Sequence, residues 1–137
     1  MRSVVADANV FVSFFVERNK AQQEAALALL GAAEEGEIVG IIPQSVIFEI
    51  VYVIQSQYAL SSRQSATVVA AVTKLPGMQI VDDCPWKRVL ELWPDPLSGL
   101  TDAAIVALAA TNRYEAVATF DRKLANKLEA FGLDSYF

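Results

Sequence analysis

Acidic side chains stand at four places in this sequence where a carboxylate is able to do chemistry, namely Asp7, Glu49, Asp102 and Asp121. Asp7 ends the apolar run at residues 4–6, and Asp121 follows the apolar run at residues 116–120. We expect both runs to be buried strands, and ligands of open α/β sheets bind just beyond the carboxyl ends of strands. Each aspartate has a plainer alternative role as the N-cap of a following helix.

Glu49 is the only charged residue between Ile38 and Ser62, and it lies within residues 44–58, which we expect to be helical. A buried carboxylate without a partner is costly, so it must be neutralised, paired or bound to a metal ion. No basic residue lies within one or two helical turns of it. The alternative is a thin solvated stripe that Glu49 shares with Ser45, Tyr52 and Ser56.

Asp102 opens an Ala-rich segment, residues 101–113, in which no further charge occurs before Arg113. An acid in the first turn of a helix also complements the helix dipole, which is the alternative explanation for Asp102. If all four acids converge, their charges repel and raise each other's pKa, and a hard divalent cation relieves that repulsion. We therefore expect the four carboxylates to bind Mg²⁺ or Mn²⁺, which activates water for attack on phosphorus.

Strands and helices alternate in the elements that must position these acids. Apolar runs favour strands at residues 4–6, 38–42, 78–81 and 116–120, with 133–137 as a possible last strand. Residues 20–35, 44–58, 61–74, 101–113 and 122–131 favour helices, 9–16 remain open between helix and strand, and 84–99 favour a loop. This alternation predicts an α/β fold, a three-layer αβα sandwich around a parallel sheet.

Composition excludes several classes of protein. The length of 137 residues predicts one domain, residues 1–137, and an apolar content of 54% excludes a disordered chain. The absence of histidine excludes Ser-His and Cys-His catalysis and His-ligated zinc. The net charge of -5 argues against a simple cationic nucleic-acid coat but not against a nuclease that recruits cations.

The sequence also predicts where the protein works. Cys84 is the single cysteine, so no intramolecular disulfide forms, which fits the reducing cytoplasm. No segment reaches the roughly 18 apolar residues that a membrane-spanning helix needs. We expect a cytoplasmic protein without a membrane partner.

In four short stretches the sequence resembles the PIN-domain family, and within it the VapC-type toxins of toxin–antitoxin pairs. These stretches are VADANVF at residues 5–11, FEI at 48–50, LTDAAIVALA at 100–109 and ATFDRKL at 118–124. Their order and spacing span essentially the whole chain and are more specific than any single stretch. The resemblance implies about five parallel strands between helices and a Mg²⁺- or Mn²⁺-dependent endoribonuclease.

The resemblance assigns Asp7, Glu49, Asp102 and Asp121 to the family's four acidic site positions. It implies that Asn9 and Thr119 support the site by hydrogen bonding. It also implies products with 5′-phosphate and 3′-hydroxyl ends, a cognate antitoxin that blocks the site, and a homodimer. Ala8 departs from the family pattern, which often has Thr or Ser there.

Two further features are consistent with this function but have plainer explanations. Arg122, Lys123 and Lys127 are basic residues near Asp121 that are able to bind RNA, or they form a solvated helix face. Val68, Val69 and Val72 offer an apolar helix face to a second copy or the antitoxin, or they belong to the core.

Two other functions remain open on the sequence alone. One is a phosphatase of the haloacid-dehalogenase type, whose nucleophile loop the segment Asp7-Ala8-Asn9 loosely matches, although Asn9 then replaces the expected second aspartate. The other is a PIN-like module without catalytic activity that binds only protein. The retention of Glu49 in an apolar helix argues against such a module.

Overall fold

The computed structural model describes all residues, 1–137. The elements along the chain are β1 (Arg2–Ala6), α1 (Ala8–Phe15), α2 (Lys20–Glu34), β2 (Ile38–Pro43), α3 (Gln44–Ser56), α4 (Ser62–Val72), β3 (Met78–Val81), α5 (Trp86–Leu92), α6 (Leu100–Thr111), β4 (Ala116–Ala118), α7 (Arg122–Ala125), the 3-10 helix η1 (Leu128–Phe131) and β5 (Asp134–Ser135).

The sheet has five strands in the order β3-β2-β1-β4-β5, and all neighbouring strands are parallel. Strand β1 is central, and Val5 aligns with Ile41 of β2 and with Val117 of β4. The chain builds the sheet outward from β1 through β2 and β3, and then continues on the other side with β4 and β5. The strand order therefore reverses between β1 and β4, and this point is where open α/β sheets bind their ligands.

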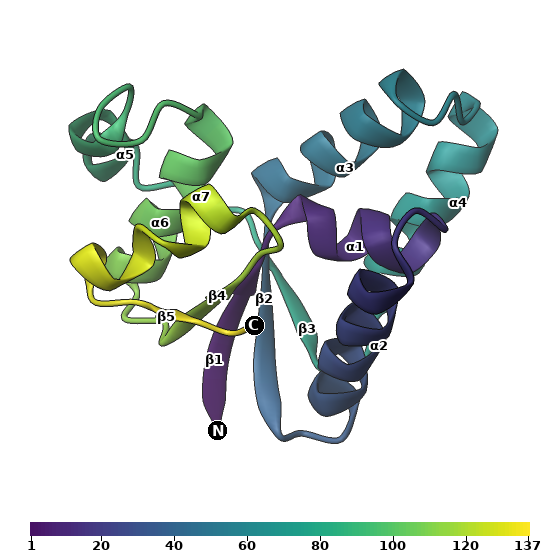
Figure 1. Cartoon of the computed structure of the whole chain (residues 1–137), viewed down its shortest axis with the longest axis horizontal. Helices are drawn as coiled ribbons and strands as arrows, with labels where there is room; N and C mark the ends of the chain where they lie inside the picture. Colours follow the sequence, from purple (N-terminus) through teal and green to yellow (C-terminus); the bar gives the residue numbers. More distant parts are fainter.

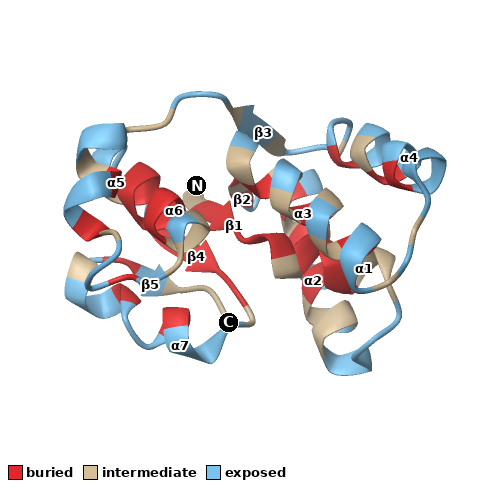
Figure 2. Cartoon of the chain, turned by 90° about the horizontal axis from the view of Figure 1, so that it is seen from above, coloured by how far each residue is buried: buried red, intermediate tan, exposed pale blue.

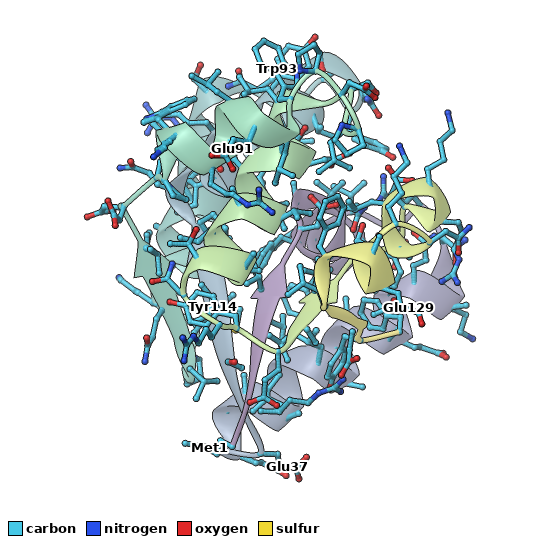
Figure 3. The ribbon with its side chains drawn as sticks, turned by 90° about the vertical axis from the view of Figure 1, so that its left-hand side faces the viewer. Met1, Glu37, Glu91, Trp93, Tyr114 and Glu129 are labelled. Atoms are coloured by element: carbon cyan, nitrogen blue, oxygen red, sulfur yellow. The ribbon has the colours of Figure 1, made fainter.

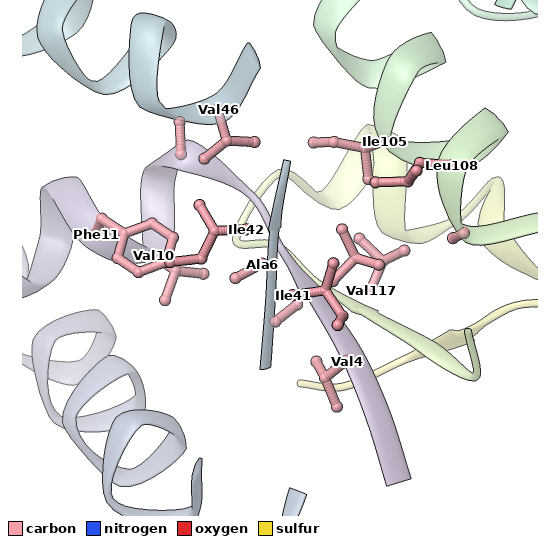
Figure 4. Packing of buried hydrophobic residues seen from close by; sticks show 14 of the residues in the cluster. Val4, Ala6, Val10, Phe11, Ile41, Ile42, Val46, Ile105, Leu108 and Val117 are labelled. Carbon is pink, nitrogen blue, oxygen red and sulfur yellow. The ribbon is translucent and has the colours of Figure 1, made fainter. Parts of the chain in front are cut away.

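Helices cover both faces of the sheet, which gives three layers. Figure 1 shows α1 and α2 on one side and α5 and α6 on the other. In the close-up of the core, Phe11 and Val46 pack on one side of the strand side chains, and Ile105 and Leu108 pack on the other (Figure 4). Buried residues concentrate in the sheet and on the helix faces turned toward it (Figure 2). The predicted α/β fold with a five-stranded parallel sheet is confirmed.

Several predicted elements differ from the observed ones. Residues 9–16, left open between helix and strand, contain α1, and residues 84–99 hold the helix α5 in addition to loop. The single helix expected at 122–131 is divided into α7 and η1. Of Val68, Val69 and Val72, the first and last are buried at 9% and 1% exposure and belong to the core, which was the alternative explanation, and Val69 is half-buried. The suggestion that these three valines form an apolar interface is therefore wrong. No helix has both the length and the hydropathy needed to cross a membrane.

Candidate active site

The four acidic residues singled out in the sequence line one cleft at the carboxyl end of the sheet. Asp7 directly follows β1, and its backbone N–H donates to the Ala118 carbonyl at the end of β4 (2.9 Å). Glu49 lies on α3, Asp102 lies in the first turn of α6, and Asp121 precedes α7. The cleft has a volume of about 190 Å³, and all four carboxylates line it.

The remaining acids are distributed elsewhere on the molecule. Figure 3 shows Glu37 beside Met1 at the amino end of the strands, so Glu37 lies at the opposite end of the sheet from the cleft. Asp134 pairs with Arg2, and Glu91 pairs with Arg88. The cleft is therefore a specific convergence of carboxylates and does not merely reflect an acidic surface.

Asp7 is the deepest of the four acids, with 5% of its surface exposed. Its Oδ1 accepts a hydrogen bond from the Ala8 N–H (2.7 Å), and its Oδ2 accepts from Thr119 Oγ1 (2.8 Å) and Asn9 Nδ2 (3.2 Å). The bond from Ala8 makes Asp7 the N-cap of α1 as well as a wall of the cleft. Burial raises the pKa of Asp7, and the charge of Asp121 adds to this, against the hydrogen bonds from Thr119 and Ala8.

Asn9 and Thr119 connect the ends of the two strands. Thr119 is fully buried, and its hydroxyl donates to Asp7 while accepting from Asn9 Nδ2 (3.1 Å) and the Asp121 N–H (3.1 Å). The Asn9 Oδ1 accepts from the Phe120 N–H (3.1 Å). The side chains of Asp7, Asn9 and Thr119 thus form hydrogen bonds with one another inside the protein. These bonds, with the one from the Asp121 N–H to Thr119, fix the positions of Asp7 and Asp121 relative to each other.

Asp121 is the most exposed of the four acids. Its Oδ1 accepts from the backbone N–H groups of Lys123 (2.9 Å) and Leu124 (3.4 Å), so it caps α7. Asp7 and Asp121 therefore have both of the roles considered from the sequence, since each caps a helix and also lines the cleft. Capping orients one carboxylate oxygen toward the helix, and the cap thereby fixes the direction of the other oxygen.

Glu49 and Asp102 complete the cleft from two helices. Burial raises the pKa of Glu49 to about 7, with further increases from the charges of Asp7 and Asp102. Burial raises the pKa of Asp102 to about 6, the charges of Asp7 and Asp121 add to this, and Lys127 opposes it. These shifts arise because half-buried carboxylates face one another, so Glu49 is no member of a freely solvated stripe.

No cation of the protein neutralises this cluster through an ion pair. The chain has two ion pairs, Arg2 with Asp134 and Arg88 with Glu91, and both involve residues outside the cleft. The charge of Lys127 lowers the pKa of Asp102 but forms no ion pair with it. The Lys127 Nζ donates instead to the Pro96 carbonyl (3.1 Å). Four mutually repelling carboxylates that no ion pair neutralises form a site that a bound cation stabilises.

The donor set fits a hard divalent cation, because every charged donor is a carboxylate oxygen and no Cys or His is present. No three acidic side chains are grouped tightly enough to hold an ion directly. Mg²⁺ retains several water ligands and needs only one or two carboxylates in contact with it. The arrangement therefore suits an ion bound partly through water.

The basic residues predicted near Asp121 lie outside the cleft. Arg122, Lys123 and Lys127 are exposed, and none lines the cavity. The cation that does line it is Arg18, from the segment between α1 and α2, which the sequence analysis did not single out. The sequence offers little signal for Arg18, because a basic residue next to the helix cap Asn19 also suits an ordinary solvated loop.

Comparisons with solved structures identify similar folds. The VapC20 toxin of Mycobacterium tuberculosis, described as cleaving the sarcin-ricin loop, superposes with a TM-score of 0.69 at 12% identity over 90% of this chain and 93% of that one. PAE2754 from Pyrobaculum aerophilum has a TM-score of 0.64 at 17% identity over 98% of this chain and 90% of that one. No curated protein matches the chain in a sequence search.

The sequence itself matches a family over most of its length. Residues 4–128 match the PIN domain, and this range contains all four acids of the cleft. The expected resemblance to this family is confirmed. The chain belongs to the PIN-domain family.

Proposed function

We propose that this protein is a metal-dependent endoribonuclease that hydrolyses RNA phosphodiesters in the acidic cleft. The observation that supports this most strongly is the convergence of Asp7, Glu49, Asp102 and Asp121 in one cavity without an ion-paired cation. Membership of the PIN-domain family gives the same reaction class by analogy.

Each acid has a role that follows from its position. Asp7, Asp102 and Asp121 hold Mg²⁺ or Mn²⁺ directly or through water, and Asn9 and Thr119 keep Asp7 in place. A bound ion would supply charge neutralisation at the phosphate and Lewis acidity toward the attacking water. Glu49, with a pKa of about 7, either contacts the ion or accepts a hydrogen bond from the attacking water and orients it. Hydrolysis leaves 5′-phosphate and 3′-hydroxyl ends.

We also propose that the protein is a VapC-type toxin of the cytoplasm with a cognate antitoxin that blocks the cleft. The similarity in fold to VapC20 over nearly the whole of both chains supports this proposal. The sarcin-ricin loop is the target described for VapC20; for the present protein we propose only RNA as the substrate class. The antitoxin has to cover an acidic cleft, so we expect it to present basic residues there.

For the predicted homodimer, the structure offers another interface in place of the α4 face considered from the sequence. Large apolar side chains are exposed on three elements at one side of the cleft, namely Phe48 and Tyr52 on α3, Trp86 and Leu90 on α5, and Leu100 on α6. Glu49 is the only charged residue of α3. Asp82 and Asp83 border this face at the hollow that Phe48 and Trp86 line, so a second copy would contact it through the exposed aromatic and leucine side chains.

The phosphatase alternative has little support. That mechanism needs an acid two residues after the nucleophile as proton donor, and Asn9 is an amide whose Oδ1 and Nδ2 are both hydrogen-bonded within the protein. The non-catalytic alternative is distinguished by experiment, because a module that only binds protein cleaves no RNA in any metal.

The test is cleavage of a mixed cellular RNA pool with Mg²⁺, Mn²⁺ or EDTA. We compare wild type with Asp7→Asn and Asp102→Asn, and we include Asp95→Asn as a control because Asp95 is an exposed acid outside the cleft. We expect metal-dependent cleavage by wild type and the control, and a loss of at least about a hundredfold in both cleft variants. Cleavage that survives in folded cleft variants contradicts the proposal.

A further inference from the structure

Besides the acidic cleft, the molecule has two larger hollows whose linings differ in charge. One hollow, of about 310 Å³, is lined by Phe48, Trp86, Asp82 and Asp83 among others and contains no Lys or Arg. The other, of about 490 Å³, is an open groove lined by Asn9, Arg18, Asn19, Gln22, Tyr58, Phe120 and Asp121. A phosphate backbone is repelled by the first hollow and attracted by the cation in the second.

The groove and the cleft are continuous. Asn9, Arg18 and Asp121 line both of them, so a strand that reaches the carboxylates passes these three residues. The rest of the groove lining is polar or aromatic, with Asn19 and Gln22 from the start of α2 and Tyr58 just beyond α3. Aromatic rings beside a cation are the usual construction of a single-strand binding track.

Arg18 is held in place by neutral partners. Its Nε and Nη2 donate to Ser13 Oγ (3.1 and 3.0 Å), and Nη2 also donates to the Asn9 carbonyl (3.3 Å). Nη1 makes a longer contact with the Tyr58 hydroxyl (3.5 Å). Ser13 is fully buried and is itself fixed by Gln22 Oε1 (3.2 Å). The side chain is thus pre-oriented while its positive charge remains unpaired.

Arg18 lines the same cleft as four carboxylates but forms an ion pair with none of them. Here the hydroxyl of Ser13 and the carbonyl of Asn9 occupy the guanidinium instead. Its charge is therefore available to an anion from outside, and a guanidinium matches the geometry of phosphate oxygens.

We propose that this groove is the binding site for the RNA nucleotide that flanks the cleaved bond, and that Arg18 holds the phosphate of that nucleotide. Tyr58 and Phe120 provide aromatic surface against which the base packs, and Asn19 and Gln22 provide hydrogen-bonding groups. Phe120 is stiffened for this role because it stacks on Phe137, with ring centroids 4.5 Å apart. Arg18 is a substrate-positioning residue, and the assignment rests on the proposed nuclease activity.

The experiment measures kcat and KM for one single-stranded RNA that wild type cleaves, over a series of salt concentrations. The variants are Arg18→Gln, Arg18→Lys and the control Arg63→Gln, since Arg63 is exposed on α4 and forms no ion pair. We expect Arg18→Gln to raise KM about tenfold with kcat within about twofold of wild type. The dependence of log(kcat/KM) on log salt becomes shallower by about 0.7, the value for one phosphate contact on a single strand.

Arg18→Lys keeps the charge but loses the planar fork, so we expect an intermediate KM with the salt dependence of wild type. Thermal unfolding of each variant shows whether the segment between α1 and α2 remains intact. An unchanged KM and salt dependence in Arg18→Gln overturns the proposal. A reduced kcat and lower Tm with unchanged salt dependence also overturns it, because Arg18 is then only structural. If wild type itself cleaves no RNA in any metal, the proposed nuclease activity fails, and this assignment fails with it.

Discussion

Among single side chains, the buried threonine behind the cleft joins two of the four acids, because its hydroxyl bonds to three groups. Thr119 Oγ1 contacts Asp7, Asn9 and the Asp121 backbone at 2.8–3.1 Å. These three contacts connect the ends of β1 and β4, which supply two of the four acids. The position of Asp7 in the cleft therefore depends on a residue that itself touches no solvent.

Replacing Thr119 by valine removes these contacts while keeping the shape of the side chain. We expect Thr119→Val to lower the free energy of unfolding by about 1–3 kcal/mol, because buried partners lose hydrogen bonds. Urea unfolding measures this, with Thr67→Val as the control, since Thr67 is exposed and its hydroxyl only donates to the Arg63 carbonyl (3.2 Å). Equal stability of the two variants contradicts the role assigned to Thr119.

The four acids could be predicted from the sequence because the residues next to each of them in the chain form a recognisable pattern. Asp7 and Asp121 follow apolar strands, and Glu49 is the only charge in a long apolar region. Arg18 had no such signal, because its importance depends on Ser13, Asn9 and Tyr58 coming together in space. Neutral groups such as the Ser13 hydroxyl and the Asn9 carbonyl form no charge pattern in the sequence, so only the structure identifies them as the groups that hold Arg18.

Helix starts position three of the four acids, with Asp7 and Asp121 as N-caps and Asp102 in the first turn of α6. The start of α6 shows how closely the Asp102 carboxylate is surrounded. Gly99 precedes α6, and a Cβ built at this position lies 3.3 Å from Asp102 Oδ2. The backbone of Gly99 has a φ of -92°, which every residue adopts, so a substitution here is not strained. A methyl group at residue 99 therefore acts on the carboxylate and not on the fold.

We expect Gly99→Ala to displace the Asp102 carboxylate by a few tenths of an ångström and to lower kcat/KM about tenfold, with little change in Tm. Gly31→Ala on α2 is a matched control, because its Cβ meets nothing within 4 Å and the change favours helix. Cleavage assays and thermal unfolding on both variants separate an effect on the Asp102 carboxylate from an effect on the stability of the fold. Wild-type activity in Gly99→Ala shows that Asp102 tolerates the shift.

The elements themselves were mostly predictable where the apolar pattern was long. Residues 78–81 coincide with β3, and the capping box of Ser61 and Gln64 begins α4 as expected. The sequence pattern did not predict α5, because the prolines on both sides of this short helix favour a loop. The helix expected at 122–131 divides after Ala125, and Leu128 continues the chain as a 3-10 turn that enters the core. Tertiary packing, which local sequence does not encode, decided both cases.

For the molecule as a whole, the exposed apolar face beside the cleft predicts self-association. Trp86 is 56% exposed and Phe48 is 69% exposed, although large aromatic side chains are usually buried. We expect wild type to sediment as a dimer at micromolar concentration and Trp86→Glu to sediment as a monomer. Leu27→Glu is the control, because Leu27 is also exposed (59%) but lies on α2, across the sheet from α5. A monomeric wild type contradicts this interface.

Stability is expected to depend on pH and on metal ions, because burying ionised carboxylates opposes folding and the repulsion between them adds to this. The pKa of Glu49 rises from 4.5 to about 7 and that of Asp102 from 3.8 to about 6, so the folded protein binds these protons more tightly than the unfolded chain. The contribution of these two groups to the free energy of unfolding is therefore greatest below about pH 4 and declines as pH rises to about 7. Glu49→Gln and Asp102→Asn remove this decline.

Thermal unfolding without metal at pH 5 and pH 7.5 tests the expectation. Glu49→Gln is more stable relative to wild type at pH 7.5 than at pH 5, whereas Glu129→Gln, an exposed acid outside the cleft, shows no such difference. Mn²⁺ raises the Tm of wild type more at pH 7.5 than at pH 5, because the ion binds ionised carboxylates and competes with protons. It raises the Tm of Asp7→Asn much less. If Mn²⁺ stabilises wild type and Asp7→Asn equally, the ion binds elsewhere and the four carboxylates lose their assigned role.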